Sequence, residues 1–211
     1  MYNFTFNIPT KIHFGKDTIS SLSELKAYGS KVLLVYGGGS VKKNGLYDTA
    51  MKILKDAGLT VFELSGVEPN PKIETVRKGV EICKNEGIDM VLAIGGGSTI
   101  DCSKVVAAGA RYDGDAWDLV LDGSKVKAAL PIFDVLTLSA TGTEMDPFAV
   151  ISDMSKNEKW GTGSPYMVPT MSILNPEYTF SVSKKQTAAG TADMMSHTME
   201  NYFSMENLSL I

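Results

Sequence analysis

The stretch MVLAIGGGSTIDCSK, residues 90–104, decides the fold of this chain. Its first five residues form an apolar run of strand length, and a helix is expected from near Ser98 onward. Three glycines, Gly95, Gly96 and Gly97, join the two parts. Glycines after a buried strand are typical of a tight turn that lets backbone approach a ligand closely. We therefore predict a strand, a turn and a helix, with a candidate binding site at the turn.

The period of the apolar residues alternates between that of strands and that of helices on both sides of this stretch. Strands are expected at 31–37, 59–65, 89–95 and 131–139, and helices at 17–29, 45–58, 71–87 and from Ser98 to about 110. Strands that alternate with helices indicate a parallel sheet covered on both faces. The predicted fold class is α/β, with a Rossmann-like sheet.

The amino-acid pattern changes before and after these alternating strands and helices. Residues 2–14 alternate polar and apolar residues in two runs broken at Pro9, which predicts an N-terminal β-hairpin. Residues 140–180 are rich in Thr, Ser, Gly and Pro, with short β-like pieces at 148–152 and 170–175. Residues 184–203 have a helical pattern. We predict an α/β domain over 1–180 and the beginning of a helical domain over 181–211.

Composition excludes several classes of function. The net charge is −4 and no basic block occurs, so neither nucleic acid nor an anionic membrane surface is favoured as a partner. The longest apolar runs have strand length, so we expect no membrane partner. The chain has two cysteines, Cys83 and Cys102, which are too few for a disulfide framework. Cytoplasmic localisation is the simplest expectation.

A second cluster repeats the opening motif. VLLVYGGGS, residues 32–40, places Gly37, Gly38, Gly39 and Ser40 after another strand. Neither cluster is a G-x-G-x-x-G or a phosphate-binding loop with Gly-Lys-Ser/Thr, and tight turns are the alternative interpretation. Two such clusters at the ends of strands in one sheet favour a nucleotide site, with phosphate at a helix start.

Several polar residues accompany these clusters. Asp101 lies in the first turn after the second cluster, where it either caps the helix or binds a ligand. Asn70 follows a third strand, and the hydroxyls of Thr137, Thr141 and Thr143 follow a later one. Asp193 and His197 are four residues apart, so a helix places them on one face, where they are able to contribute two ligands to a divalent metal.

The segments GGGSTID, LSATGTE, NPEYT and GTADMMSHTMENY, in this order and spacing, resemble the iron-containing (group III) alcohol dehydrogenases. The branch they resemble contains the NADPH-dependent butanol dehydrogenases and aldehyde reductases. The resemblance implies a dinucleotide-binding α/β domain followed by a helical domain, with the metal between them. It also implies a homodimer formed through the N-terminal hairpin, and a chain that corresponds to about the first half of a family member.

The resemblance also implies roles for individual residues. Gly37, Gly38 and Ser40 would surround the adenosine ribose and its 2′ substituent, and Gly95, Gly96, Gly97 and Ser98 would hold the pyrophosphate, with Asp101 nearby. Asn70, Thr137 and Thr141 would contact phosphate, ribose or nicotinamide, and Lys159 and Tyr178 would line the cleft. Asp146 occupies a position near the nicotinamide where relatives have Asn.

The implied activity is hydride transfer between NADP(H) and a primary alcohol or aldehyde such as butanol or butanal, with iron or zinc as the metal. Asp193 and His197 match two of the family's four metal ligands, and His13, the other histidine, matches none. With two ligands missing, we expect little turnover from residues 1–211 alone. The alternatives are a relative of glycerol dehydrogenase or dehydroquinate synthase, and a non-catalytic nucleotide-binding fragment.

The expected preference between NADP(H) and NAD(H) depends on one position. NAD-preferring relatives have an Asp after the strand that VLLVY resembles, and here that position is Gly37. No carboxylate repels a 2′-phosphate there, and Lys42 and Lys43 lie within one turn. NADP(H) is therefore expected in preference to NAD(H).

Overall fold

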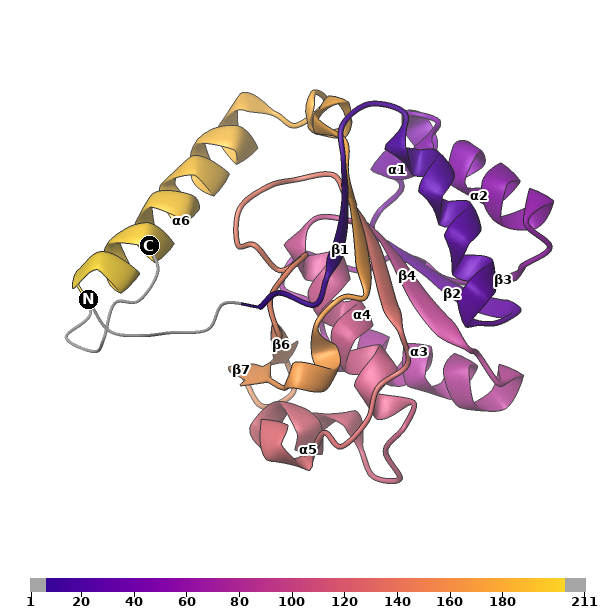
Figure 1. Ribbon diagram of the computed structural model, residues 1–211. Coiled ribbons are helices and arrows are strands. Elements are labelled where there is room, and N and C mark those ends of the chain that lie inside the picture. Colours follow the sequence, from indigo (N-terminus) through magenta and orange to yellow (C-terminus); the bar gives the residue numbers. More distant parts are fainter. Residues whose placement is uncertain (1–6, 204–211) are drawn as a thin grey trace.

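The computed structural model describes residues 7–203, and it is built around one six-stranded sheet (Figure 1). The strand order is β1-β8-β5-β4-β2-β3, and all five neighbouring pairs are parallel. The strands are β1 (Lys11–Phe14), β2 (Lys31–Tyr36), β3 (Thr60–Leu64), β4 (Met90–Gly95), β5 (Ile132–Leu136) and β8 (Met171–Leu174). The predicted α/β class with a Rossmann-like parallel sheet is confirmed.

Helices cover both faces of the sheet, and β2 and β4 are therefore buried on both sides. One face packs on the 3-10 helix η1 (Thr18–Tyr28) and on α2 (Leu46–Asp56), with the short α1 (Ser40–Lys43) at its edge. The other packs on α3 (Ile73–Glu86), α4 (Gly97–Gly109) and α5 (Ala116–Leu121). Leu34 contributes to the first core and Leu33 to the second, as alternation along a strand requires.

The order in which successive strands join the sheet reverses between β2 and β4. From β2 the chain moves outward to β3, then crosses to β4 on the other side and continues to β5. Such a reversal leaves a crevice outside the carboxyl ends of the two strands, and this is where open α/β sheets bind ligands.

A two-stranded antiparallel ribbon adjoins the sheet. It consists of β6 (Phe148–Asp153) and β7 (Glu158–Gly163), and a bridge between Lys72 and Ser152 connects it to the residues before α3. The remaining short elements are the 3-10 turns η2 (Gly123–Lys125), η3 (Pro165–Met167) and η4 (Pro176–Thr179). We predicted β6 and β8 as β-like pieces and did not predict β7, α5 or α1.

The predicted N-terminal hairpin is only partly within the described residues. Its second run is β1, which pairs with β8 at the edge of the sheet. Its first run falls at residues 2–8, and 1–6 lie outside the described part, so the hairpin stays a prediction.

The final helix, α6 (Lys184–Phe203), leaves the sheet and extends away from it (Figure 1). Its one buried residue is Gly190. The predicted boundary near residue 180 coincides with the turn η4 that precedes this helix, and the division into two domains remains a prediction.

Candidate cofactor cleft and metal-ligand pair

A cleft of about 440 Å³ lies at the carboxyl ends of β2 and β4. The two strands are neighbours in register, with Tyr36 opposite Ile94, so the glycine clusters that follow them meet at the same edge. The residues of our predicted cofactor set that line this cleft are Gly37, Gly38, Ser40, Gly95, Gly96, Gly97, Ser98, Thr137 and Tyr178.

The first cluster is a turn that only glycine accommodates easily. Gly39 precedes α1 with φ +105°, a left-handed conformation that disfavours other residues. A Cβ on Gly37 would lie 3.2 Å from the carbonyl oxygen of Val67, so this wall of the cleft is bare backbone. The N–H groups of Lys42 and Lys43 donate to the carbonyl of Gly39 and start the short helix.

The second cluster forms the entry to α4. A Cβ on Gly95 would lie 2.4 Å from Oγ1 of Thr99, which explains why the turn needs glycine at the end of the strand. Gly96 precedes the helix, and Gly97 and Ser98 occupy its first turn beside the cleft. The first N–H groups of a helix have no partner within it, and the first three residues of this 13-residue helix line the cleft.

Three residues from separate parts of the chain meet beside this turn. The backbone N–H of Asn70 donates to Oγ of Ser98 at 3.3 Å, and Nζ of Lys159 donates to Oδ1 of Asn70 at 2.7 Å. Asn70 has φ +55°, a conformation that asparagine tolerates better than most residues. Asn70 and Lys159 do not line the cleft itself, and they are linked to it through Ser98.

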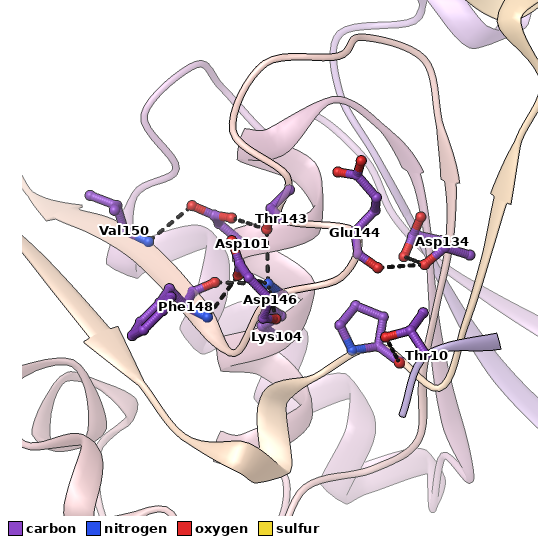
Figure 2. A network of polar contacts seen from close by, with 11 residues as sticks. Thr10, Asp101, Lys104, Asp134, Thr143, Glu144, Asp146, Phe148 and Val150 are labelled. Atoms are coloured by element: carbon purple, nitrogen blue, oxygen red, sulfur yellow. Dashed lines mark hydrogen bonds and ion pairs between the residues drawn. The ribbon is translucent and has the colours of Figure 1, made fainter. Parts of the chain in front are cut away.

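Asp101 and Asp146 lie outside the cleft lining, in a polar network on the neighbouring side of α4 (Figure 2). Asp101 accepts hydrogen bonds from Oγ1 of Thr143 at 2.7 Å and from the N–H of Val150 at 2.9 Å. Burial raises its pKa, and these two bonds oppose the rise. Oδ1 of Asp146 accepts from Nζ of Lys104 and from the N–H of Phe148, both at 2.8 Å. Both carboxylates have protein partners, and their role toward a cofactor stays a prediction.

Lys42 is not directed into the cleft. Its ammonium lies 4.9 Å from the ring centroid of Tyr36 and 4.3 Å from that of Tyr47, and 3.9 Å from a carboxylate oxygen of Glu63. The hydroxyls of both tyrosines donate to Glu63. From the sequence, we treated Lys42 as a cation beside the 2′ substituent. We did not single out Glu63, because only the pairing of β3 with β2 brings it next to this helix.

Asp193 and His197 lie one turn apart on α6, with Oδ1 and Nε2 separated by 3.8 Å. Both side chains are about half exposed. One carboxylate and one imidazole are suitable donors for iron or zinc, and they supply half of a four-ligand set. Within residues 7–203, no group of three or more His, Cys, Asp or Glu side chains is arranged to hold a metal. His13 contacts Ser21 and Glu24 on η1 instead.

Gly190 connects this helix to the cleft. A Cβ at Gly190 would lie 2.9 Å from the carbonyl oxygen of Ser139, directly after the segment that carries Thr137. The absence of a side chain therefore allows α6 to approach the polypeptide that lines the cleft. Val182, Ser183 and Gln186, from the start of α6 and the turn before it, form part of the cleft wall, and sequence reasoning did not single them out.

Across the described residues, the structure contains no helix long and apolar enough to cross a membrane.

The fold and the cleft define a Rossmann-like α/β unit followed by a helix with a potential metal-ligand pair, and sequence comparison gives the family. The family model for iron-containing alcohol dehydrogenase matches residues 9–176. The chain belongs to the iron-containing alcohol dehydrogenase family.

Named relatives fall within the same group. The chain is 62% identical over 205 residues to NADH-dependent butanol dehydrogenase A of Clostridium acetobutylicum, with 97% of this chain and 53% of the relative covered. It is 40% identical to the NADPH-dependent aldehyde reductase YqhD of Escherichia coli, with 96% and 52% covered. The chain therefore spans about half the length of these relatives.

A solved structure supports the same assignment. The crystal structure of NADH-dependent butanol dehydrogenase A from Thermotoga maritima superposes with a TM-score of 0.93 at 49% identity. The match covers 96% of this chain and 52% of that protein.

Proposed function

We propose that this protein is a metal-dependent oxidoreductase that transfers a hydride between NADP(H) and a primary alcohol or aldehyde such as butanol or butanal. The observation that carries the proposal is the cleft between β2 and β4, which brings two glycine clusters to one edge of the sheet. The family membership and the names of the relatives support the reaction class.

Within this proposal, the chain's own residues bind and orient. The bare backbone at Gly37 and Gly38 leaves space for the adenosine ribose, and the start of α4 at Gly97 and Ser98 receives the pyrophosphate. Thr137 and Tyr178 line a further part of the cleft. When bound, nicotinamide supplies the redox chemistry, and a divalent metal supplies a Lewis acid for the substrate oxygen. Asp193 and His197 would hold that metal from α6.

For the cofactor we propose NADP(H), because no carboxylate is among the residues that line the cleft beside Gly37. The ammonium of Lys42 is held by Tyr36, Tyr47 and Glu63, so the support from nearby cations is smaller than the sequence suggested. Relatives with NADH and relatives with NADPH in their names both match this chain. A titration with both cofactors therefore decides this part of the proposal.

The test of the activity begins with the intact mass of the expressed protein, which establishes its length. Butanal-dependent oxidation of NADPH is then measured for the complete gene product after addition of iron or zinc. We expect metal-dependent turnover that is lost when His197 is replaced by Ala. Cofactor binding without turnover, at any metal concentration, would instead favour the non-catalytic nucleotide-binding module.

Residues 1–211 provide a separate test of the ligand account. A preparation that contains only these residues is expected to bind cofactor and to show little butanal reduction, since two family ligands are absent. Robust turnover by that preparation would contradict this account and would require further ligands from a second chain.

A further inference from the structure

A lysine is completely buried beside the cleft. Lys104, on α4, has 0% exposure, and its ammonium lies within 2.9 Å of four oxygens that all belong to residues 143–148 (Figure 2). These are Oγ1 of Thr143, the carbonyl and Oδ1 of Asp146, and the carbonyl of Phe148. A buried ammonium is costly unless it is paired and hydrogen-bonded, and this one satisfies both conditions.

The network continues from Lys104 to the first turn of α4. The hydroxyl of Thr143 accepts a hydrogen bond from Lys104 and donates one to Asp101. The other oxygen of Asp101 accepts from the N–H of Val150. Two positions on α4, one turn apart, therefore hold both ends of the segment 143–150 against the helix.

Two residues of the proposed cofactor site, Thr141 and Lys159, are connected to this segment. Before this segment, the hydroxyl of Thr141 borders the start of α4, because a Cβ built on Gly97 would lie 3.4 Å from its Oγ1. Within it, Phe148 begins β6, which pairs with β7. Lys159 of β7 reaches back to Asn70 beside Ser98. The placement of Thr141 and Lys159 thus depends on how residues 143–148 are held.

We propose that Lys104 is a positioning residue of the cofactor site: by holding residues 143–148 on α4, it fixes Thr141 and the β6–β7 ribbon beside the start of that helix. The proposal rests on the proposed function, because it assumes that the cleft binds a dinucleotide. Lys104 does not line the cleft, so its effect on the cofactor is indirect. A prearranged site binds more tightly because less ordering accompanies binding.

A second anchor holds the same segment from the sheet side. Oγ of Ser172, on β8, lies 2.7 Å from the carbonyl oxygen of Glu144 and 2.6 Å from Oδ2 of Asp134 on β5. This contact does not involve Lys104. Loss of the Lys104 contacts is therefore expected to loosen the segment 143–148 without unfolding the sheet.

The test compares Lys104→Met with the unaltered chain of residues 1–211, using NADPH and NADH fluorescence titrations and hydrogen exchange of residues 141–150. Methionine is unbranched and one atom shorter than lysine, and it removes the charge and the donors. We expect cofactor affinity to fall at least about tenfold, which equals about 1.4 kcal/mol, and exchange at residues 148 and 150 to accelerate. The matched control is Arg77→Met, which removes the two bonds between Arg77 and Asp115.

The control separates positioning from general destabilisation. Arg77 joins α3 to the start of α5, and neither partner lines the cleft, so its loss is expected to lower thermal stability and leave affinity within about twofold. Unchanged affinity in a folded Lys104→Met chain would overturn the inference. If circular dichroism shows that this variant is unfolded, Thr143→Val, which keeps Lys104, replaces it. Unchanged affinity in Thr143→Val would then overturn the inference, and a severalfold loss would support it.

The same titrations distinguish a failure of the proposed function from a failure of this inference. If the unaltered, folded chain binds neither cofactor, the proposed function is contradicted, and this inference is contradicted with it. If the unaltered chain binds and Lys104→Met binds equally well, only the inference about Lys104 is wrong.

Discussion

Gly190 on α6 and Ser139 after β5 are in contact because Gly190 has no side chain: a Cβ there would lie 2.9 Å from the carbonyl oxygen of Ser139. The helix that carries Asp193 and His197 thus approaches the cleft at its one buried position. The separation between the metal-ligand pair and the cofactor cleft depends on this contact.

Replacement of Gly190 by Ala tests this dependence. Alanine raises intrinsic helix propensity by up to about 1 kcal/mol, and the clash with Ser139 acts in the opposite direction by displacing the helix. A 20-residue helix with one buried residue has little stability without its packing. We therefore expect faster hydrogen exchange across residues 187–197 in Gly190→Ala. Ala189→Ser, at an exposed neighbouring position, is the control, and equal protection in both variants would show that the contact does not hold α6.

Asp134 leads to a prediction about pH. Its side chain is 1% exposed, and burial raises its pKa well above the usual range. A protonated Asp134 is able to donate to Ser172, whose own hydroxyl proton then goes to the carbonyl of Glu144. Because the folded state holds this proton more tightly than the unfolded state, the contribution of Asp134 to stability is full below its unfolded pKa. That contribution is lost as the pH rises through the folded pKa.

Asp134→Asn removes this dependence, because asparagine supplies a donor and carries no charge at any pH. The stability of the variant relative to the unaltered chain should increase between about pH 5 and about pH 8, as measured by urea unfolding. A difference that stays constant or decreases over this range would mean that Asp134 is ionised in the folded state.

The two thiols are expected to be unreactive in the folded chain. Cys83 and Cys102 are both buried, and burial raises the pKa of each to about 12. Since the thiolate is the reactive form, neither should react with a thiol reagent near neutral pH until the chain unfolds. Labelling followed by mass spectrometry, with and without urea, measures this. Rapid modification without urea would contradict the packing described for α3 and α4.

The edge strand β1 supports the predicted homodimer. Phe14 is 72% exposed and Ile12 is 37% exposed on a strand that pairs on only one side within the described residues. An apolar edge of this kind is protected in many proteins by pairing with another chain. We predict a dimeric mass by light scattering at micromolar concentration and a shift toward monomer in Phe14→Lys. A monomer at all concentrations would contradict the dimer.

Local pattern was enough to predict the strands β2, β3, β4 and β5 and the helices α2, α3 and α4, because their apolar residues recur with a regular period. The i,i+4 geometry of Asp193 and His197 was equally predictable, since any helix places them together. The strand β7 was not predicted, because EKWGTG has two glycines and no alternating pattern, and its pairing with β6 determines its conformation.

The role of Lys104 could not be predicted from the sequence for a related reason. A lysine on a helix is ordinarily solvent-exposed, and its partners here lie about 40 residues away along the chain. The one signal was its position within an apolar helix, between Ser103 and Val105. The engagement of Lys42 by Glu63 likewise depends on the pairing of β2 with β3.

The most direct test of the central claim, that this cleft binds NADP(H), is a titration of residues 1–211 with NADPH and with NADH, repeated on Gly37→Asp. A side chain at this position would begin 3.2 Å from the carbonyl oxygen of Val67, in the wall of the cleft where we place the 2′-phosphate. We predict that NADPH binds more tightly than NADH to the unaltered chain, and that Gly37→Asp lowers NADPH affinity at least about tenfold while NADH affinity changes much less. Equal affinities in the unaltered chain, or NADPH binding that is unaffected by Gly37→Asp, would contradict the account.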